Sequence, residues 1–381
     1  MDGRVAVFPA LVVLAVSALA QGPAPDSGRW YFAISGDSRD CGDLIMPKIA
    51  QNIAANQDRT PVAFFWHLGD FRYMYDIDCD ILTRKYPSYD CQERKPPLGV
   101  NDMDEYLAGA WQDFLERQLR PFGQTKVFLG IGNHELFAGR TRVEFCRTFQ
   151  KWLTQEPLHG QRRADVKRGL TSTEGDTTYH FVLRGVDFIF LDNADEKAFT
   201  TEQITWLSGV LAADAEDPTV KAIIVGMHEP LPYSTGRLHA MDVSCQGRCS
   251  GQQVYDMLFR AQNLSAPPEK QKRVFVFASH LHYFEENVYD TPEHQGQVLT
   301  GWAVGTGGAE QKGPTIRYGY VLVEVRPDGS IGTQFKEVTR ESPPLASGPG
   351  AATLTEFCFS LNKSPITWRR PAGACPCGSS R

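Results

Sequence analysis

Five short apolar runs, separated by helix-like segments, constrain what this chain can fold into. They are rich in β-branched and aromatic residues, have the length of buried strands, and cover residues 30–35, 62–68, 126–131, 220–225 and 273–278. The apolar spacing between them predicts helices over residues 43–57, 103–120, 143–153, 201–213 and 251–262. This alternation of strands and helices predicts an α/β fold with ligands at the carboxyl ends of the strands.

Two further pairs of segments indicate antiparallel strands. Residues 178–184 and 186–192 flank Arg184-Gly185, and residues 318–325 and 331–338 flank Pro327-Asp328-Gly329. Both connections have the composition of tight turns, so each pair predicts a β-hairpin. We therefore expect sheets in which parallel and antiparallel strands are mixed.

The remaining segments are predicted to be irregular. Residues 72–100, which contain two cysteines and three prolines, are interpreted as a long loop, and residues 156–176 as a basic surface loop. From about residue 341 the chain is rich in Pro, Gly and Ser, which favours a loosely packed C-terminal tail over 341–381. One domain over residues 28–340 precedes this tail.

The first twenty residues have the composition of a secretory signal peptide. Arg4 precedes an apolar stretch over residues 5–20, which ends in the cleavage-type pattern Ala18-Leu19-Ala20. These 16 residues include Pro9 and are fewer than the roughly 20 that span a bilayer core. We therefore expect a cleavable signal over 1–20, a secreted or periplasmic protein, and no stable membrane span in the mature form. An uncleaved anchor is the alternative.

Export would place the nine cysteines in an oxidising compartment, where disulfides form and persist. Cys245 and Cys249 close a short loop and are the best local pair, whereas spacing does not give the remaining connectivity. A zinc site would need a second ligand pair at matching spacing, and none is evident.

Composition excludes two other classes of protein. With 42% hydrophobic and 22% charged residues, the chain is too apolar to be intrinsically disordered. The net charge of −6, without a long basic run, opposes sequence-independent nucleic-acid binding, which neutralises phosphates with Lys and Arg. No nucleic-acid partner is expected.

Each of the five predicted core strands ends in residues that can bind metals. In chain order the endings are Gly36-Asp37-Ser38-Arg39, Gly69-Asp70-Phe71-Arg72-Tyr73, Gly132-Asn133-His134-Glu135, Gly226-Met227-His228-Glu229-Pro230 and Ser279-His280-Leu281-His282. One such ending could be a turn or a helix cap, but repetition at all five strands indicates a shared site. Carboxylate, amide and imidazole ligands suit iron, manganese or zinc. An aspartate between two metals could bridge them, and paired metals activate water for attack on a phosphoryl centre.

In this order the motifs GD-x, GD-x-x-Y, GNHE, H-x-P and H-x-H resemble those of the calcineurin-like metallophosphoesterase superfamily, over about residues 30–310. The resemblance implies an α/β fold of two mixed β-sheets packed as a sandwich flanked by helices, the four-layer metallophosphoesterase fold. It also implies two metal centres. The first would be held by Asp37, Asp70 and His282, and the second by Asp70, Asn133, His228 and His280. His134, supported by Glu135, would stabilise the transition state or protonate the leaving oxygen.

One position departs from the superfamily pattern. Many members have a histidine two residues after the first aspartate, where this chain has Arg39, whose guanidinium has no lone pair for a metal. Tyr73 lies where purple acid phosphatases, which also lack that histidine, place a metal-binding tyrosine. Tyr73 is thus either a ligand of iron(III) in the first centre or an ordinary aromatic of its loop. Arg39 could instead contact the substrate phosphate, since arginine matches phosphate oxygens bidentately.

The resemblance implies an exported hydrolase of phosphate esters in which a metal-bound hydroxide attacks phosphorus. The expected cofactors are two metal ions, iron together with zinc, manganese or a second iron. The expected substrate is a small phosphomonoester, as for acid phosphatases. Two alternatives stay open: a phosphodiesterase or nucleotidase with the same centre, and a secreted binding protein that keeps the fold without turnover.

Overall fold

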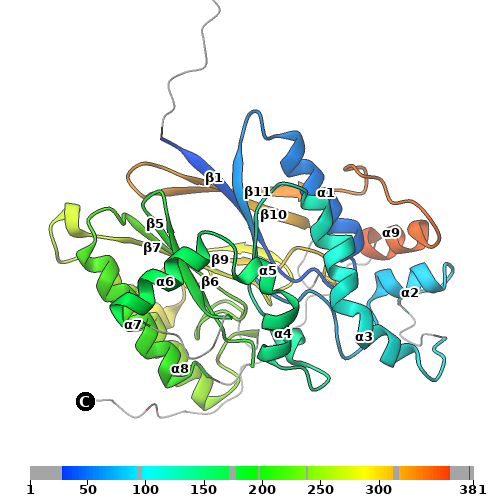
Figure 1. Cartoon of the computed structure of the whole chain (residues 1–381), viewed down its shortest axis with the longest axis horizontal. Coiled ribbons are helices and arrows are strands. Elements are labelled where there is room, and N and C mark those ends of the chain that lie inside the picture. Colours follow the sequence, from blue (N-terminus) through cyan, green and yellow to red (C-terminus); the bar gives the residue numbers. More distant parts are fainter. Residues whose placement is uncertain are drawn as a thin grey trace, which may run out of the picture.

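The computed structural model describes residues 28–92, 97–170, 177–195, 198–236, 239–311, 317–360 and 377. Two β-sheets pack against each other and are flanked by helices (Figure 1). The predicted α/β sandwich is confirmed. The expected signal peptide, residues 1–20, lies outside the described residues. Within the described ranges, no helix has the length and apolar character needed to cross a membrane.

The first sheet has five strands in the order β11-β10-β1-β2-β3. Their bounds are Trp30–Ser35 for β1, Val62–His67 for β2, Val127–Leu129 for β3, Tyr318–Val325 for β10 and Ile331–Val338 for β11. Strands β1, β2 and β3 run parallel, while β10 runs antiparallel to both β1 and β11. The predicted hairpin of β10 and β11 is confirmed.

The second sheet has six strands in the order β4-β5-β6-β7-β9-β8. Their bounds are Tyr179–Leu183 for β4, Val186–Leu191 for β5, Ala222–Met227 for β6, Arg273–Ala278 for β7, Phe284–Glu286 for β8 and Thr300–Val304 for β9. Strands β5, β6, β7 and β9 are parallel, and β4 and β8 are antiparallel to their neighbours. Both sheets are therefore mixed, as the sequence predicts.

The five predicted helices are present, with shifted ends. They are α1 (Gly42–Ala55), α3 (Asp102–Phe114, continued by a π-helical turn over Leu115–Leu119), the pair α4 (Arg142–Thr148) and α5 (Gln150–Leu153), α7 (Thr201–Glu216) and α8 (Cys245–Ala261). Helix α8 begins earlier than predicted because the hydroxyl of Ser244 accepts a hydrogen bond from the Gly247 N–H at 2.8 Å. Apolar residues of α7 and α8 pack on the outer face of the second sheet.

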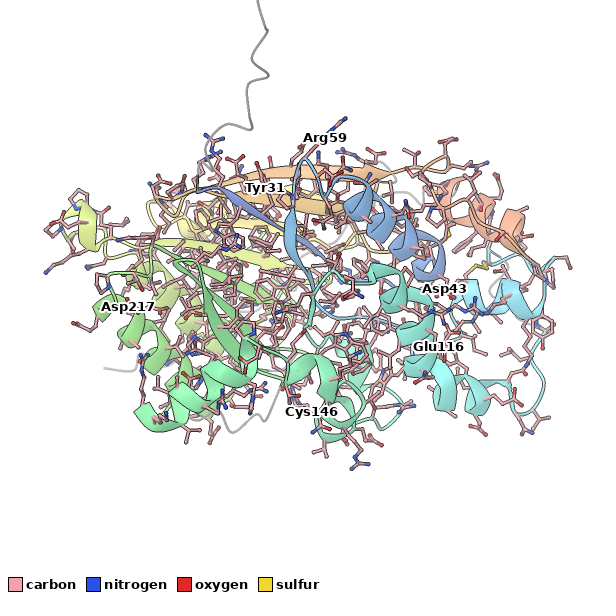
Figure 2. All side chains as sticks on the ribbon, turned by 45° about the horizontal axis from the view of Figure 1, so that its top comes forward. Tyr31, Asp43, Arg59, Glu116, Cys146 and Asp217 are labelled. Atoms are coloured by element: carbon pink, nitrogen blue, oxygen red, sulfur yellow. A yellow bond between two sulfur atoms is a disulfide. The ribbon has the colours of Figure 1, made fainter. Side chains whose placement is uncertain are left out.

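Aromatic side chains fill the space between the two sheets. Phe32 of β1 and Phe64 of β2 both meet Phe188 of β5 edge to face, with ring centroids 5.1 Å apart in each pair. Figure 2 shows this dense packing of side chains between the sheets, whereas the labelled Arg59 points away from it. These contacts hold the carboxyl ends of the strands of one sheet close to those of the other.

Two segments expected to be loops contain helices. Helix α2 (Cys79–Lys85) forms within residues 72–100, and helix α6 (Leu158–Arg168) forms within the expected basic loop. The interpretation of these segments as loops is wrong because tertiary contacts stabilise the helices. In α6, Leu158 and Asp165 are buried while the basic side chains lie on the other faces.

The tail also differs from the expectation over residues 351–360. Helix α9 (Ala351–Ser360) lies against α2, and a disulfide joins its Cys358 to Cys41. Further disulfides join Cys79 to Cys91 and Cys249 to Cys377. The expected Cys245–Cys249 pair is therefore wrong, because the partner of Cys249 comes from the far end of the chain. The domain bounds at 28–340 and 341–381 stay a prediction.

A buried histidine attaches α6 to the second sheet. His180 of β4 lies 2.8 Å from Asp187 Oδ2 through its Nδ1 and 3.0 Å from Asp165 Oδ2 through its Nε2. Burial alone would lower the pKa of His180, but the carboxylates of Asp187 and Asp165 outweigh it and raise the pKa to about 10.

We therefore expect the His180 ring to keep both protons at pH 8. Because the folded-state pKa is raised, the stabilisation is complete below pH 6.5, the ordinary value, and is lost as the pH rises toward 10. Nitrogen-15 NMR of the imidazole, assigned by loss of the signal in His180→Gln, measures the protonation directly. A ring that loses its proton between pH 6 and pH 7 would contradict the expectation.

Candidate metal centre

The loops that follow β1, β2, β3, β6 and β7 meet at one edge of the sandwich. The convergence follows from the parallel order of these strands within each sheet, which puts their carboxyl ends at one edge. All ten site residues expected from the sequence lie on these loops, and nearly all are buried: Asp37, Arg39, Asp70, Asn133, His134, Glu135, His228 and His282 are buried, and Tyr73 and His280 are partly so.

Three of the expected metal ligands have left-handed backbone conformations. Asp37, Asp70 and His280 have φ values of 55°, 60° and 62°. Such conformations cost of order 1–3 kcal/mol for residues other than glycine and persist only where surrounding contacts fix them. One of these contacts joins two motifs, since the His280 N–H donates to Asp37 Oδ2 at 2.7 Å.

Glu135 holds the second and third motifs together. Its carboxylate accepts hydrogen bonds from the backbone N–H groups of Asp70, Phe71 and Gly132, each at 2.8 Å. These bonds use both carboxylate oxygens, and the expected support of the His134 ring by Glu135 stays a prediction. Glu135 positions the backbone of Asp70. Burial, followed by the charge of Asp70, raises the pKa of Glu135 to about 8 despite the three N–H groups, which lower it.

Gly132 is required by the same close approach. A Cβ atom at this position would lie 2.3 Å from Asp70 Oδ1, well inside van der Waals contact. The glycine thus lets the loop after β3 pass directly beside the carboxylate that is expected to bridge the metals.

The residues of the second centre converge as a ligand set. Asp70, His228 and His280 offer donor atoms within 4.8 Å of one another. His228 Nε2 lies 2.9 Å from Asn133 Oδ1, 3.1 Å from His280 Nδ1 and 3.2 Å from Asp70 Oδ1. The Nδ1–H of His228 donates to the Leu68 carbonyl at 3.0 Å, which directs Nε2 toward the centre.

The charge around His228 shows that this centre fits a cation. Burial lowers the pKa of His228, but the carboxylates of Asp70 and Asp37 outweigh it and raise the pKa to about 10. The imidazole therefore carries a proton among oxygen and nitrogen acceptors. A metal ion that replaces this proton would be coordinated by Asp70, Asn133, His228 and His280.

The first centre is arranged differently, because a guanidinium group lies inside it. Arg39 Nη2 is 2.9 Å from Nε2 of His282, the atom expected to bind metal, and Arg39 Nη1 is 2.7 Å from His134 Nε2. Asp37 Oδ1 lies 3.4 Å from His282 Nε2. Within the part of the chain that the structure describes, Asp37 Oδ1 and Asp70 Oδ2 are buried without a hydrogen-bond partner. These two oxygens fit a cation, but His282 is already engaged by Arg39.

Tyr73 makes the contacts of an aromatic residue of its loop. Its ring lies 4.4 Å from the guanidinium carbon of Arg39, a cation–π contact, and its hydroxyl accepts a hydrogen bond from the Tyr75 hydroxyl at 2.8 Å. Burial and the hydrogen bond with Tyr75 raise the pKa of Tyr73, which opposes a phenolate. Its role as a metal ligand stays a prediction.

His134 faces Arg39 and not an open site. Its Nδ1–H donates to the Tyr73 carbonyl, so Nε2 carries the lone pair and accepts a hydrogen bond from Arg39. Burial, and then the positive charge of Arg39, lower the pKa of His134 to about 4. The ring is therefore neutral and orients the guanidinium.

Two polar residues at the site escaped the sequence-based prediction. His239 lies beside His280, with 3.4 Å between His239 Nδ1 and His280 Nε2. Asn193, after β5, accepts the backbone N–H of His228 at 3.2 Å. His239 follows the fourth motif, which was its one available signal, whereas Asn193 has no motif around it.

Comparison with known proteins adds evidence on the fold. No protein-family model matches the sequence, and no curated protein matches it. Among solved structures, the chain is similar to the purple acid phosphatase PPD1 from yellow lupin (Lupinus luteus) seeds, with a TM-score of 0.50 and 13% identity over 81% of this chain. A phosphatase of Mycoplasma pneumoniae matches with a TM-score of 0.37 and 10% identity, covering 81% of this chain and 93% of its own.

The lupin structure agrees with the resemblance indicated by the motifs. This chain spans about half, 51%, of the length of the lupin chain. At 13% identity the likeness establishes the fold alone, and that fold is the one expected for a calcineurin-like metallophosphoesterase.

The role of Glu135 can be tested by Glu135→Gln. The amide keeps the size of the side chain but offers one acceptor oxygen for three backbone N–H groups. We expect metal affinity to fall about 10–100-fold, as for other groups that orient ligands. Isothermal titration with Mn²⁺ measures this change.

Glu144→Gln is a matched control for Glu135→Gln. Glu144 also accepts a backbone N–H, that of Thr141 at 2.9 Å, but it is partly exposed and the group that it holds is the N-terminal cap of helix α4. We expect its affinity for Mn²⁺ to equal that of the wild type. Equal affinity in both variants would show that Glu135 does not position the ligands.

Proposed function

We propose that this chain is a metal-dependent hydrolase of phosphate esters. The observation that carries the proposal is the convergence of Asp70, Asn133, His228 and His280 on one buried point, in a fold shared with a purple acid phosphatase. A metal ion bound there supplies Lewis-acid chemistry, since it polarises a phosphoryl oxygen and lowers the pKa of water. Iron, zinc and manganese suit this donor set.

Arg39 is the residue suited to bind the phosphate group. It is 6% exposed, is held by two histidines, and has an Nε–H without a hydrogen-bond partner among the described residues. A guanidinium in a fixed orientation can donate to two oxygens of one phosphate. We therefore propose that Arg39 orients the substrate beside the metal.

Two roles in the reaction are open to His134: it orients Arg39, or it donates a proton to the leaving group. As a neutral ring it accepts from Arg39 and fixes its direction. If the substrate displaces that hydrogen bond, a protonated Nε2 could instead donate to the leaving oxygen. These two roles predict different dependence on the leaving group.

A small phosphomonoester is the substrate that we propose, with a phosphodiesterase or nucleotidase as the second candidate. The proposal that the protein is exported is supported by the disulfides Cys41–Cys358, Cys79–Cys91 and Cys249–Cys377, because such bonds persist in oxidising compartments. A non-catalytic binding protein would keep the same ligands but lack turnover.

The proposal is tested with para-nitrophenyl phosphate and the corresponding diester. We expect hydrolysis of the monoester by the metal-loaded protein. In Asp70→Asn, kcat/KM should fall at least about 10³-fold, because a carboxylate ligand of the metal is lost. Circular dichroism of the variant checks that it folds. Metal bound without hydrolysis of either ester would favour the binding protein, and hydrolysis of the diester alone would favour the phosphodiesterase.

The role of His134 is tested with His134→Asn on two monoesters. A general acid matters most for a poor leaving group, so its loss would lower kcat about 10²–10⁴-fold for an alkyl phosphate and far less for para-nitrophenyl phosphate. A positioning role through Arg39 instead predicts the same loss for both substrates. The structure favours the second result, because His134 Nε2 accepts from Arg39.

A further inference from the structure

In the first metal centre, few of the expected ligand atoms are free of a hydrogen bond to another side chain. The resemblance implies four ligands there: Asp37, Asp70, Tyr73 and His282. The Nδ1–H of His282 donates to the Glu310 carbonyl at 3.0 Å, so its Nε2 carries the lone pair, and that lone pair accepts from Arg39 at 2.9 Å. The Tyr73 hydroxyl is turned to Tyr75. Asp37 and the shared Asp70 remain, fewer than the three protein ligands that catalytic metal sites keep.

The second centre keeps its complete ligand set. Four residues direct a nitrogen or oxygen atom to the same point: Asp70, Asn133, His228 and His280. The donor atoms of the other three lie within 3.2 Å of His228 Nε2. The two centres share Asp70 but differ in one respect: the guanidinium of Arg39 lies in the first centre, against the Nε2 atom of His282. An arginine has no lone pair to offer a metal and repels a cation.

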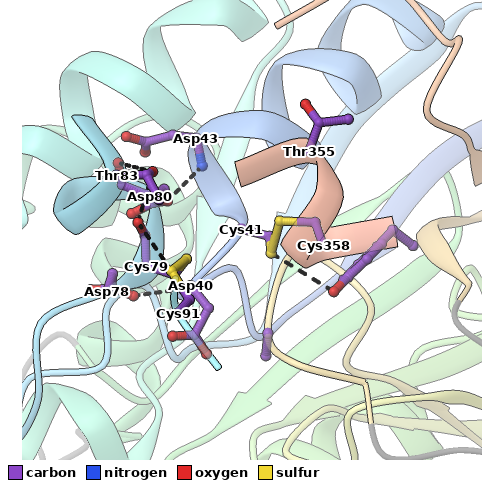
Figure 3. The surroundings of a disulfide bond; sticks show 12 residues. Asp40, Cys41, Asp43, Asp78, Cys79, Asp80, Thr83, Cys91, Thr355 and Cys358 are labelled. Atoms are coloured by element: carbon purple, nitrogen blue, oxygen red, sulfur yellow. Dashed lines mark hydrogen bonds between the residues drawn. A yellow bond between two sulfur atoms is a disulfide. The ribbon is translucent and has the colours of Figure 1, made fainter. Parts of the chain in front are cut away.

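The backbone of Arg39 is fixed on both sides. The N–H of Asp40, the next residue, donates to Asp78 Oδ1 at 2.6 Å, and Cys41 is joined to Cys358 by a disulfide (Figure 3). On the other side, the Ser38 hydroxyl donates to Gln118 Oε1 at 2.6 Å. These contacts on both sides fix the position of the Arg39 backbone in the site.

The side chain of Arg39 is also held along its length. The ring of Tyr73 covers one face of the guanidinium at 4.4 Å, and Nε2 atoms of His134 and His282 accept from its two ends. Because Tyr73 and His282 are two of the expected ligands of the first metal, both are engaged in holding the guanidinium.

From these contacts we infer that the guanidinium of Arg39 takes the place of the first metal ion, so that the chain binds one ion, at the second centre. The inference deepens the proposed function and rests on it. The guanidinium supplies one positive charge in a fixed place where a divalent ion would supply two. It can hold a phosphate oxygen, but it cannot activate water, which leaves that task to the single ion.

The experiment counts metal ions and does not depend on turnover. The wild type and Arg39→His are loaded with Mn²⁺, passed through a desalting column, and measured by mass spectrometry and electron paramagnetic resonance. We expect one isolated Mn²⁺ per chain in the wild type. In Arg39→His, which offers a lone pair in place of the cation, we expect two ions with the spectrum of a coupled pair.

Arg317→His is the matched control. Arg317 also lies over an aromatic ring, that of Phe335 at 4.7 Å, but on the exposed β-hairpin side of the first sheet. We expect this variant to bind one ion like the wild type. Arg39→Ala serves as a second variant if Arg39→His does not fold, and it should also gain an ion, because His282 is released.

Each outcome decides the inference. Two ions in the wild type, or one ion in both Arg39 variants, would overturn it while leaving the proposed hydrolase intact. No ion in the wild type would overturn the metal-dependent function together with it. Hydrolysis of para-nitrophenyl phosphate, measured on the same samples, separates failure of the metal count from failure of the proposed activity.

Discussion

The face-to-face packing of the two sheets is the interaction on which the rest of the structure depends. Phe32, Phe64 and Phe188 form its centre, and each aromatic pair adds roughly 0.5–1.5 kcal/mol beyond the area that it buries. The packing brings the loops after β1 and β2 next to those after β6 and β7. Residues of the candidate site as distant in the sequence as Asp37 and His282 therefore meet, with 3.4 Å between Asp37 Oδ1 and His282 Nε2.

Packing alone does not set the directions of the candidate site residues, because three of them have strained backbones. The left-handed conformation of Asp70 is stabilised by Glu135, whose carboxylate binds three N–H groups in two motifs. A hydrogen bond of this kind contributes about 0.5–1.5 kcal/mol, so the three bonds together are comparable with the cost of the strain. Glu135, the glutamate of the GNHE motif, is thus explained by the backbone groups that it holds. Its carboxyl group acts on the chemistry only through the position of Asp70.

The sequence pattern predicts those structural features that depend on residues close together in the chain. The bounds of β1 and β7 are as predicted, because each is a continuous apolar run, and the candidate site residues are recognised because they directly follow such runs. Helix α6 was missed because its basic surface hides the two buried positions that anchor it. The partner of Cys249 and the place of His239 depend on contacts between distant segments, which spacing in the sequence does not encode.

Arg39 shows how far a motif can be interpreted without its surroundings. From the sequence, the missing histidine has two explanations: compensation by a tyrosine ligand or loss of function. The structure adds a third, because the same tyrosine lies on the guanidinium and the remaining histidine of that centre accepts its N–H. Neutralising two carboxylates requires only a positive charge, which arginine supplies. Activating water requires an open coordination position, which arginine lacks. A site of this kind can therefore exchange one metal ion for a side chain, provided that the other ion keeps its full set of ligands.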